Sequence, residues 1–318
     1  MRPSFQISRV WVVLFVLLVV ACSPFPRAAE NKQSVSVSGA FALYPMMTRW
    51  AEEYQRLHPE IVFDISAGGA GKGMADALAG VVDIGMVSRA ITPEEEAKGA
   101  FWVAVAKDAV FPTMNVNNPV KDRILQKGLT RQIFYGIFIS GEITTWGQAV
   151  GDAQVQDPIH VYTRSDAAGA PETWAKYLGK KQEDLLGVGV FGDPGLIEAV
   201  ARDPLGIGFN NLGYAYDQST GQPVAGIWII PIDANENNLA DPEEILDTKD
   251  KAIEAVATHR YPSPPARELY LVTLGKPSGV VLDFIQWILT DGQQFVEEAG
   301  YIQLPQKQIE ENLQKLKD

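Results

Sequence analysis

The sequence predicts an α/β protein with a mostly parallel sheet. Three observations indicate this class: short strand-like runs alternate with helical patterns, glycine turns separate the two, and the chain ends on packed helices. The chain has 318 residues, of which 46% are hydrophobic and 21% charged. This length suggests about two domains, and the apolar content is too high for a disordered chain.

The N-terminus predicts a lipoprotein signal peptide over residues 1–21. A basic start is followed by an apolar run, Val10–Ala21, which is too short to span a membrane, as is every later stretch. The tetrapeptide Val19-Val20-Ala21-Cys22 resembles a bacterial lipobox, so we expect Cys22 to carry a lipid. The alternative is an ordinary signal peptide followed by an unmodified cysteine. Residues 22–32, which are polar and contain two prolines, are expected to form a tether.

The strands and helices are expected in the following order. Gln33–Val37 alternates polar and apolar residues, as a half-buried strand does. A helix follows from Pro45, because apolar residues recur at helical spacing until Pro59. The remaining expected elements are strands at Ile61–Ile65 and Val82–Met86, a helix at Met74–Leu78, and a packed C-terminal helix within Val280–Gly300.

Three turns between a strand and a helical pattern are candidates for anion binding: Ser38–Ala42, Gly68–Gly73 and Arg164–Ala170. Backbone N–H groups and helix N-termini converge on ligands at such turns. Gly68–Gly73 is not a P-loop, because Lys72 is followed by glycine. A G-x-G-x-x-G spacing ending at Gly192 is interpreted as chance, because Asp-Pro-Gly interrupts the turn that follows it.

Composition excludes several classes of function. With one cysteine and three histidines, the chain can form no intrachain disulfide and no Cys/His zinc cluster. A net charge of −12 argues against nucleic-acid binding. The sequence contains no recognisable nucleophile or catalytic metal motif, so we expect the protein not to be an enzyme and to need no catalytic cofactor.

Several segments in succession resemble the phosphate-binding proteins of the PstS type; they include SGAFALYPMMTRWAEEY, SAGGAGKGMADALAGVVDIGMVSR, YTRSDAAGAPETW, GIGFNNLGY and YPSPPARELYLVT. The resemblance implies a two-lobed periplasmic binding protein fold of type II, with two parallel-type sheets, flanking helices and two crossover strands near Ala109–Asn115 and Leu269–Thr273. One lobe would comprise 33–113 plus 274–318 and the other 114–273, and they would close over a ligand.

The resemblance also implies the residues of the anion site, which are Ala40, Phe41, Ala42, Ala70, Gly71, Lys72, Ser88, Arg89, Arg164, Asp166, Ala168, Gly169 and Ala170. All five of these alanines stand in turns that carry hydroxyl groups in the family, and each occupies a position where Ser or Thr is usual. Lys72 also replaces a threonine, so we expect it to bind the ligand and its loss to abolish binding. We expect Arg164 and Asp166 to pair as scaffold. The alternatives are a solvated Lys72 and an exposed Arg89.

The resemblance implies that the protein captures an oxyanion and delivers it to an ABC transporter permease. Phosphate is the first candidate for this oxyanion. The protein would be a monomer in the periplasm or at the cell surface, anchored to the membrane through Cys22. Two alternatives remain open: the same fold binding a carboxylate or organophosphate, and a sensory or surface module without a transport partner.

A second motif, called here the Asn/Asp loop, covers residues 233–244. Its spacing is similar to the calcium loop of an EF-hand and predicts a structural Ca²⁺ site. The expected ligands are Asp233, Asn235, Asn237, the carbonyl of Leu239, Asp241 and Glu244. The alternative is a polar turn that needs no metal.

Overall fold

The computed structural model describes residues 33–317. The predicted signal peptide, Cys22 and the tether lie outside the described residues. Within 33–317, no helix combines the length and apolar character needed to cross a membrane.

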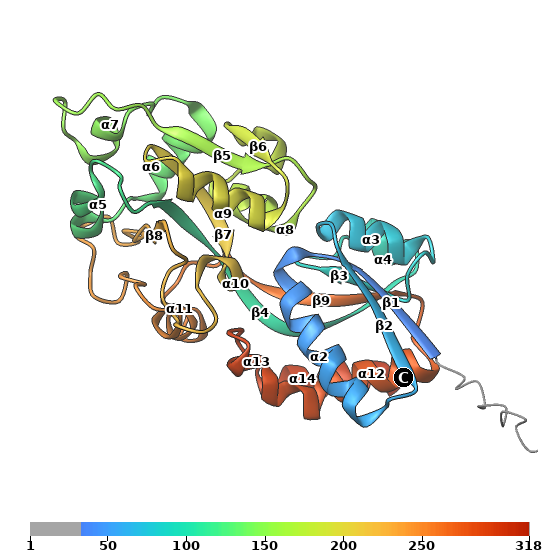
Figure 1. Cartoon of the computed structure of the whole chain (residues 1–318). Helices are drawn as coiled ribbons and strands as arrows, with labels where there is room; N and C mark the ends of the chain where they lie inside the picture. The colour runs from blue at the N-terminus through green and yellow to red at the C-terminus, as the bar shows by residue number, and fades with distance from the viewer. Residues whose placement is uncertain (1–32, 318) are drawn as a thin grey trace, which may run out of the picture. The chain divides into compact units, whose positions relative to one another are not determined.

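Nine strands form one hydrogen-bonded series in the order β2-β1-β3-β9-β4-β7-β5-β6, with β8 paired to β4 (Figure 1). Their bounds are β1 Gln33–Gly39, β2 Ile61–Ala67, β3 Ile84–Val87, β4 Ala100–Asn115, β5 His160–Arg164, β6 Val188–Val190, β7 Gly206–Asn211, β8 Ile227–Ile229 and β9 Ala266–Leu274.

The α/β class predicted from the sequence is confirmed, and the strand pairing adds detail to it. β1 pairs in parallel with β2 and β3, and β5 pairs in parallel with β6 and β7. The long strands β4 and β9 pair antiparallel with each other and with their other neighbours. The sheet is therefore mixed, because two long antiparallel strands connect two parallel groups.

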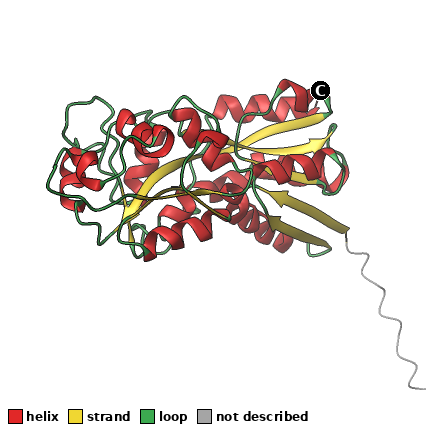
Figure 2. Cartoon of the chain, turned by 90° about the horizontal axis from the view of Figure 1, so that it is seen from above, coloured by secondary structure: helices red, strands yellow, loops and turns green. Residues whose placement is uncertain are grey.

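Helices lie on both sides of the strands (Figure 2). Their bounds are α2 Tyr44–Leu57, α3 Ala70–Leu78, α4 Pro93–Ala97, α5 Lys121–Lys127, α6 Arg131–Tyr135, α7 Trp146–Val150, α8 Gly169–Tyr177, α9 Gly192–Arg202, α10 Leu212–Ala215, α11 Lys249–Ala257, α12 Gly279–Leu289, α13 Gln294–Glu298 and α14 Gln306–Lys317.

Helix α2 shows how the sequence pattern becomes packing. Pro45 lies in its first turn, where a missing N–H removes no helical hydrogen bond. Trp50 is fully buried, and its indole N–H donates to the carbonyl of Gly292 at 2.8 Å. Leu57, which the spacing places on the same apolar face, is 63% exposed at the end of the helix.

The described residues bury two hydrophobic clusters. Core 1 contains apolar residues of β1, β3, α2, α3 and α12 together with Val103–Ala106 of β4. Core 2 contains residues of β7, β8, α8, α9 and α11 together with Ala109–Phe111 of β4. Strand β4 therefore passes from one core to the other between Ala106 and Ala109, and its pairing register with β9 shifts between Ala104 and Ala106. The predicted lobe boundaries stay a prediction.

Candidate functional site

The predicted anion site lies where strands β1, β2, β3 and β5 end. Because β1, β2 and β3 are parallel, the turns that follow them meet at one edge of the sheet. The turn after β2 is tied to β1, since the N–H groups of Gly68 and Gly69 donate to the carbonyl of Gly39 at 2.9 and 3.0 Å. Helix α3 begins directly after this turn, and α8 begins after the turn that follows β5.

The turn before α8 packs directly against the turns that follow β2 and β3. The N–H of Gly71 donates to the carbonyl of Ala167 at 3.1 Å. At Gly169 an added Cβ would lie 2.2 Å from the Ser88 hydroxyl oxygen, so only glycine allows this approach. The Phe41 ring lies 5.2 Å from the guanidinium carbon of Arg164. The structure thus brings together predicted site residues from both ends of the sheet.

Arg164 is the buried charge at the centre of this arrangement, with a side chain that is 1% exposed. Its Nε and Nη2 donate to the two carboxylate oxygens of Asp166, the first at 2.7 Å, and its Nη1 donates to Asp193. Burial alone would lower the pKa of Arg164, but the carboxylates of Asp193 and Asp166 raise it. Arg164 and Asp166 pair as the sequence predicts, and the second carboxylate gives the trio a net charge of about −1.

Asp193 is a residue that the sequence analysis missed. It is fully buried in the first turn of α9, and its Oδ1 also accepts the N–H of Asn211 at 3.2 Å. The prediction that Asp193-Pro194-Gly195 interrupts the strand-to-helix turn is wrong, because α9 begins at Gly192 with Pro194 in its first turn. An acidic residue at a helix start that follows a strand was the available signal.

Lys72 does not stand free at the turn. Its ammonium pairs with Asp76 one helical turn along α3, and its side chain is 46% exposed. Asp76 also accepts the Ser38 hydroxyl at 2.6 Å. Burial raises the pKa of Asp76, but the hydrogen bonds from Lys72 and Ser38 outweigh it and lower that pKa. An anion that binds Lys72 must therefore compete with Asp76.

The alanines that replace hydroxyl residues are buried, with exposed fractions of 6% or less; they are Ala40, Ala42, Ala70, Ala168 and Ala170. The first three belong to core 1, and Ala170 belongs to core 2. Their methyl groups contribute to packing and offer an anion no donor. Ser88 keeps a hydroxyl at the site and is 2% exposed. Any anion here depends on backbone N–H groups, on Ser88 and on charged side chains.

Arg89 links the turn after β3 to α8. Its guanidinium donates to both oxygens of Glu95, at 3.0 and 2.6 Å, and its Nε lies 3.3 Å from a carboxylate oxygen of Glu172. The hydrogen bonds that Arg89 donates to Glu95 raise the pKa of Arg89 above its usual value. The side chain is only 15% exposed, so the alternative of a free loop charge is wrong.

A cavity of about 440 Å³ adjoins these turns. Predicted site residues Gly71, Arg89 and Ala168 line it, together with Lys176, Lys180 and Lys181 of α8 and the segment after it. Gln182, also in its wall, donates from its side chain to the carbonyl of Asp166 at 2.7 Å. The cavity gives an anion a cationic approach to the turns in a chain whose net charge is −12.

The Asn/Asp loop folds around its own side chains. Asp233 is buried and accepts the N–H groups of Asn237 and Asn238, at 3.1 and 2.9 Å. The side-chain amides of Asn235 and Asn237 donate to Asp241. Within residues 33–317, no group of three or more His, Cys, Asp or Glu side chains is placed to hold a metal ion. The Ca²⁺ site therefore stays a prediction, and the polar turn remains the alternative.

Comparison with known proteins places these features in context. A family model described as a PBP superfamily domain matches residues 26–292. The phosphate-binding protein PstS of Xylella fastidiosa is 26% identical over 327 residues, which cover 91% of this chain and 88% of that protein. PstS of Pseudomonas aeruginosa is 26% identical over 322 residues, and the match covers 93% of this chain and 91% of that protein.

Solved structures agree with the sequence matches. A phosphate-bound structure from Clostridium perfringens, described as a phosphate ABC transporter substrate-binding protein, superposes with a TM-score of 0.70. It is 26% identical in sequence, and the match covers 86% of this chain and all of that one. These findings confirm the resemblance predicted from the turn sequences, and the relatives they identify are named as binding proteins.

Proposed function

Because this chain belongs to the PBP superfamily, we propose that it is an extracytoplasmic solute-binding protein that captures an oxyanion, phosphate first, and delivers it to an ABC importer. We further propose that a lipid on Cys22 anchors it to a bacterial membrane, in the periplasm or at the cell surface. The names of its relatives support the ligand class, since they are phosphate-binding proteins.

One observation carries the proposal: four strand-end turns meet around the buried Arg164. The N-termini of α3 and α8 both open at this point, and helix N-termini favour anions. The contact between Gly71 and Ala167 closes the turns directly on each other. A ligand held between them would replace this hydrogen bond, so binding requires the turns to separate and then close on the anion.

A second candidate ligand class is supported by the buried alanines. Each hydrogen bond forgone costs roughly 1 kcal/mol, and several such losses would remove much of the roughly 8 kcal/mol of a micromolar complex. A carboxylate or organophosphate would use the same charges and would place carbon against the methyl groups. A surface or sensory module without a transport partner is the remaining alternative.

Calorimetry on the protein that begins at Ser23 tests the proposal. Phosphate would be titrated first, then sulfate, arsenate, small carboxylates and small organophosphates. Saturable phosphate binding supports the proposal, whereas a response only to carboxylates or organophosphates would keep the fold and change the ligand. No binding of any of these anions would contradict a solute-binding role.

The variant Lys72→Ala tests the role predicted for this lysine. If the ammonium leaves Asp76 for the ligand, the variant loses phosphate binding, while Lys98→Ala, which removes an exposed lysine of the same lobe, binds as the parent does. Unchanged affinity in Lys72→Ala would exclude the lysine from the site and leave the backbone N–H groups and Arg164 as its donors.

A further inference from the structure

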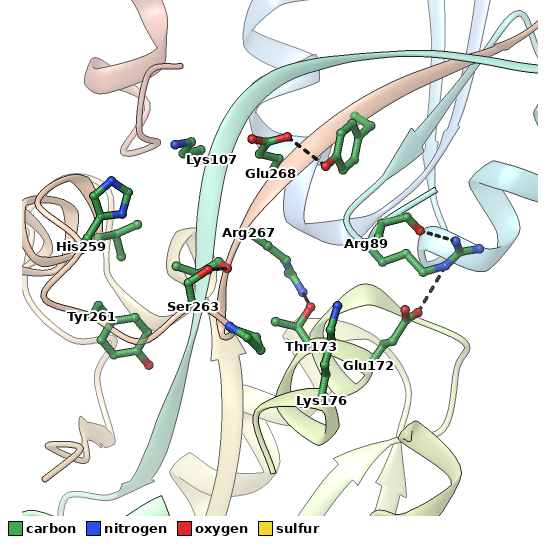
Figure 3. Close-up of a pocket in the computed structure, with 15 residues that line it drawn as sticks. Arg89, Lys107, Glu172, Thr173, Lys176, His259, Tyr261, Ser263, Arg267 and Glu268 are labelled. Carbon is green, nitrogen blue, oxygen red and sulfur yellow. Dashed lines mark hydrogen bonds and ion pairs between the residues drawn. The ribbon is translucent and has the colours of Figure 1, made fainter. Parts of the chain in front are cut away.

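A second cavity, called here the strand cavity, lies against the long strands β4 and β9 (Figure 3). Its volume is about 370 Å³, within the range of cavities that hold small organic ligands. Its wall includes cationic residues from four segments of the chain: Arg89 after β3, Lys107 on β4, Lys176 on α8 and Arg267 on β9. It shares Arg89, Glu172 and Lys176 with the cavity beside the predicted anion site, but Arg164, Asp166 and Gly169 do not line it.

Arg267 is the most deeply placed of these cations, with a side chain that is 7% exposed. Its Nη1 donates to the Thr173 hydroxyl at 2.8 Å, and its Nη2 donates to the side chain of Asn211. Asp108 lies 3.5 Å from Nη2. The Nε group is buried and has no hydrogen-bond partner among the described residues. A buried donor without a partner costs free energy, so the protein does not fully satisfy the Arg267 guanidinium.

Two lysines add positive charge without a close ion-pair partner. In the described part of the chain, the ammonium groups of Lys107 and Lys176 have no ion pair or hydrogen bond, and Figure 3 shows Lys176 extending from α8 toward Arg267. The two carboxylates of the wall are already engaged. Glu172 pairs with Arg89, and Glu268 accepts hydrogen bonds from Tyr270 and Gln308 at 2.9 and 2.8 Å.

The rest of the wall is suited to carbon. Val256, Tyr261, Pro264 and Tyr270 present apolar or aromatic surface beside the cationic groups. The cavity thus combines separated cations with an apolar face, which suits a carbon skeleton bearing more than one negative group. We propose that the strand cavity binds a small organic polyanion of the di- or tricarboxylate class, at a site separate from the strand-end turns.

Calorimetry with citrate and succinate tests this site, using the protein that begins at Ser23. Both probes are titrated with and without a large excess of inorganic phosphate. Phosphate should compete for the strand-end turns but not for the strand cavity, so the comparison shows which site holds the probe. We expect saturable binding of at least one probe that phosphate does not displace. A failure of phosphate to bind would leave this expectation unchanged, so the two proposals can fail separately.

Variants locate the binding. Lys107→Gln and Lys176→Gln should each weaken the probe roughly tenfold, the loss expected for one charge-assisted hydrogen bond. Lys276→Gln, which removes an exposed lysine outside the cavity, should bind as the parent does. Unfolding midpoints in urea verify that all three variants fold. The proposal is overturned if neither probe binds, if phosphate displaces the bound probe, or if the two cavity variants bind as tightly as Lys276→Gln does.

Discussion

We expect the substitution Asp193→Asn to lower the stability of the protein and to raise its affinity for anions. Arg164 is buried between two carboxylates, so the cluster carries one negative charge more than is required to neutralise the guanidinium. The substitution removes that charge and keeps an oxygen that can accept the N–H of Asn211. The amide NH2 then takes the place of the oxygen that accepts from Arg164, so this charge-assisted hydrogen bond is lost while the pairing with Asp166 stays intact.

The structure sets the size of the effect. A hydrogen bond to a charged group contributes about 1.5–3 kcal/mol, so we expect Asp193→Asn to lower the free energy of unfolding by about 2 kcal/mol. This is less than the roughly 3–5 kcal/mol for breaking a buried ion pair, because Asp166 still neutralises the guanidinium. With a urea dependence of about 2 kcal/mol per molar, the unfolding midpoint would fall by about 1 M.

Affinity for an anion should move in the opposite direction. Without the extra negative charge the cluster is neutral, so an oxyanion at the turns meets less repulsion and phosphate binds more tightly. Urea unfolding and calorimetry measure the two effects, with the exposed loop substitution Asp157→Asn as control. An unfolding midpoint equal to that of the control, or weaker phosphate binding than the parent, would refute this account of Asp193.

Three further predictions concern other features. Burial raises the pKa of Asp108 from 3.8 to about 6, so its contribution to stability is full below about pH 4 and falls by about 3 kcal/mol as the pH rises past 6. Urea unfolding across this range should show that slope in the parent and not in Asp108→Asn. Gly169→Ala places a Cβ 2.2 Å from the Ser88 hydroxyl oxygen and should lower the free energy of unfolding by about 1–3 kcal/mol. Gly213→Ala, whose Cβ meets nothing closer than 3.5 Å, should lower it less. Equal losses in the two variants would contradict the close approach at Gly169. Ca²⁺ at millimolar concentration should raise the thermal midpoint through the Asn/Asp loop, and Glu244→Gln should remove the effect; a parent midpoint that does not respond to Ca²⁺ would favour the metal-free turn.

The local sequence pattern was enough to predict the strands whose ends form the candidate site. The strand predicted at Gln33–Val37 is β1, and the strand predicted at Ile61–Ile65 is the start of β2. Glycine turns after these strands marked the positions where chain segments approach closely, because a side chain would clash there. The fold class followed from the alternation of such units.

The charge pairing could be predicted only in part. Asp166 lies two residues from Arg164, and that pair was expected, but Asp193 is brought to it by the packing of α9 on β5, which local pattern does not encode. Lys72 is different, because its partner Asp76 stands four residues along the same helix. That i, i+4 spacing was visible in the sequence and predicts the observed ion pair.

The passage of β4 through both cores limits how the protein can be divided. A fragment that starts at Met114, the predicted lobe boundary, would lack Ala109, Val110 and Phe111, which core 2 buries completely. It would also lose most of the ladder between β4 and β7, which runs from Val110 to Met114. The two halves are therefore not interchangeable modules, and recombining them with relatives requires exchanging the β4–β9 pair along with one half.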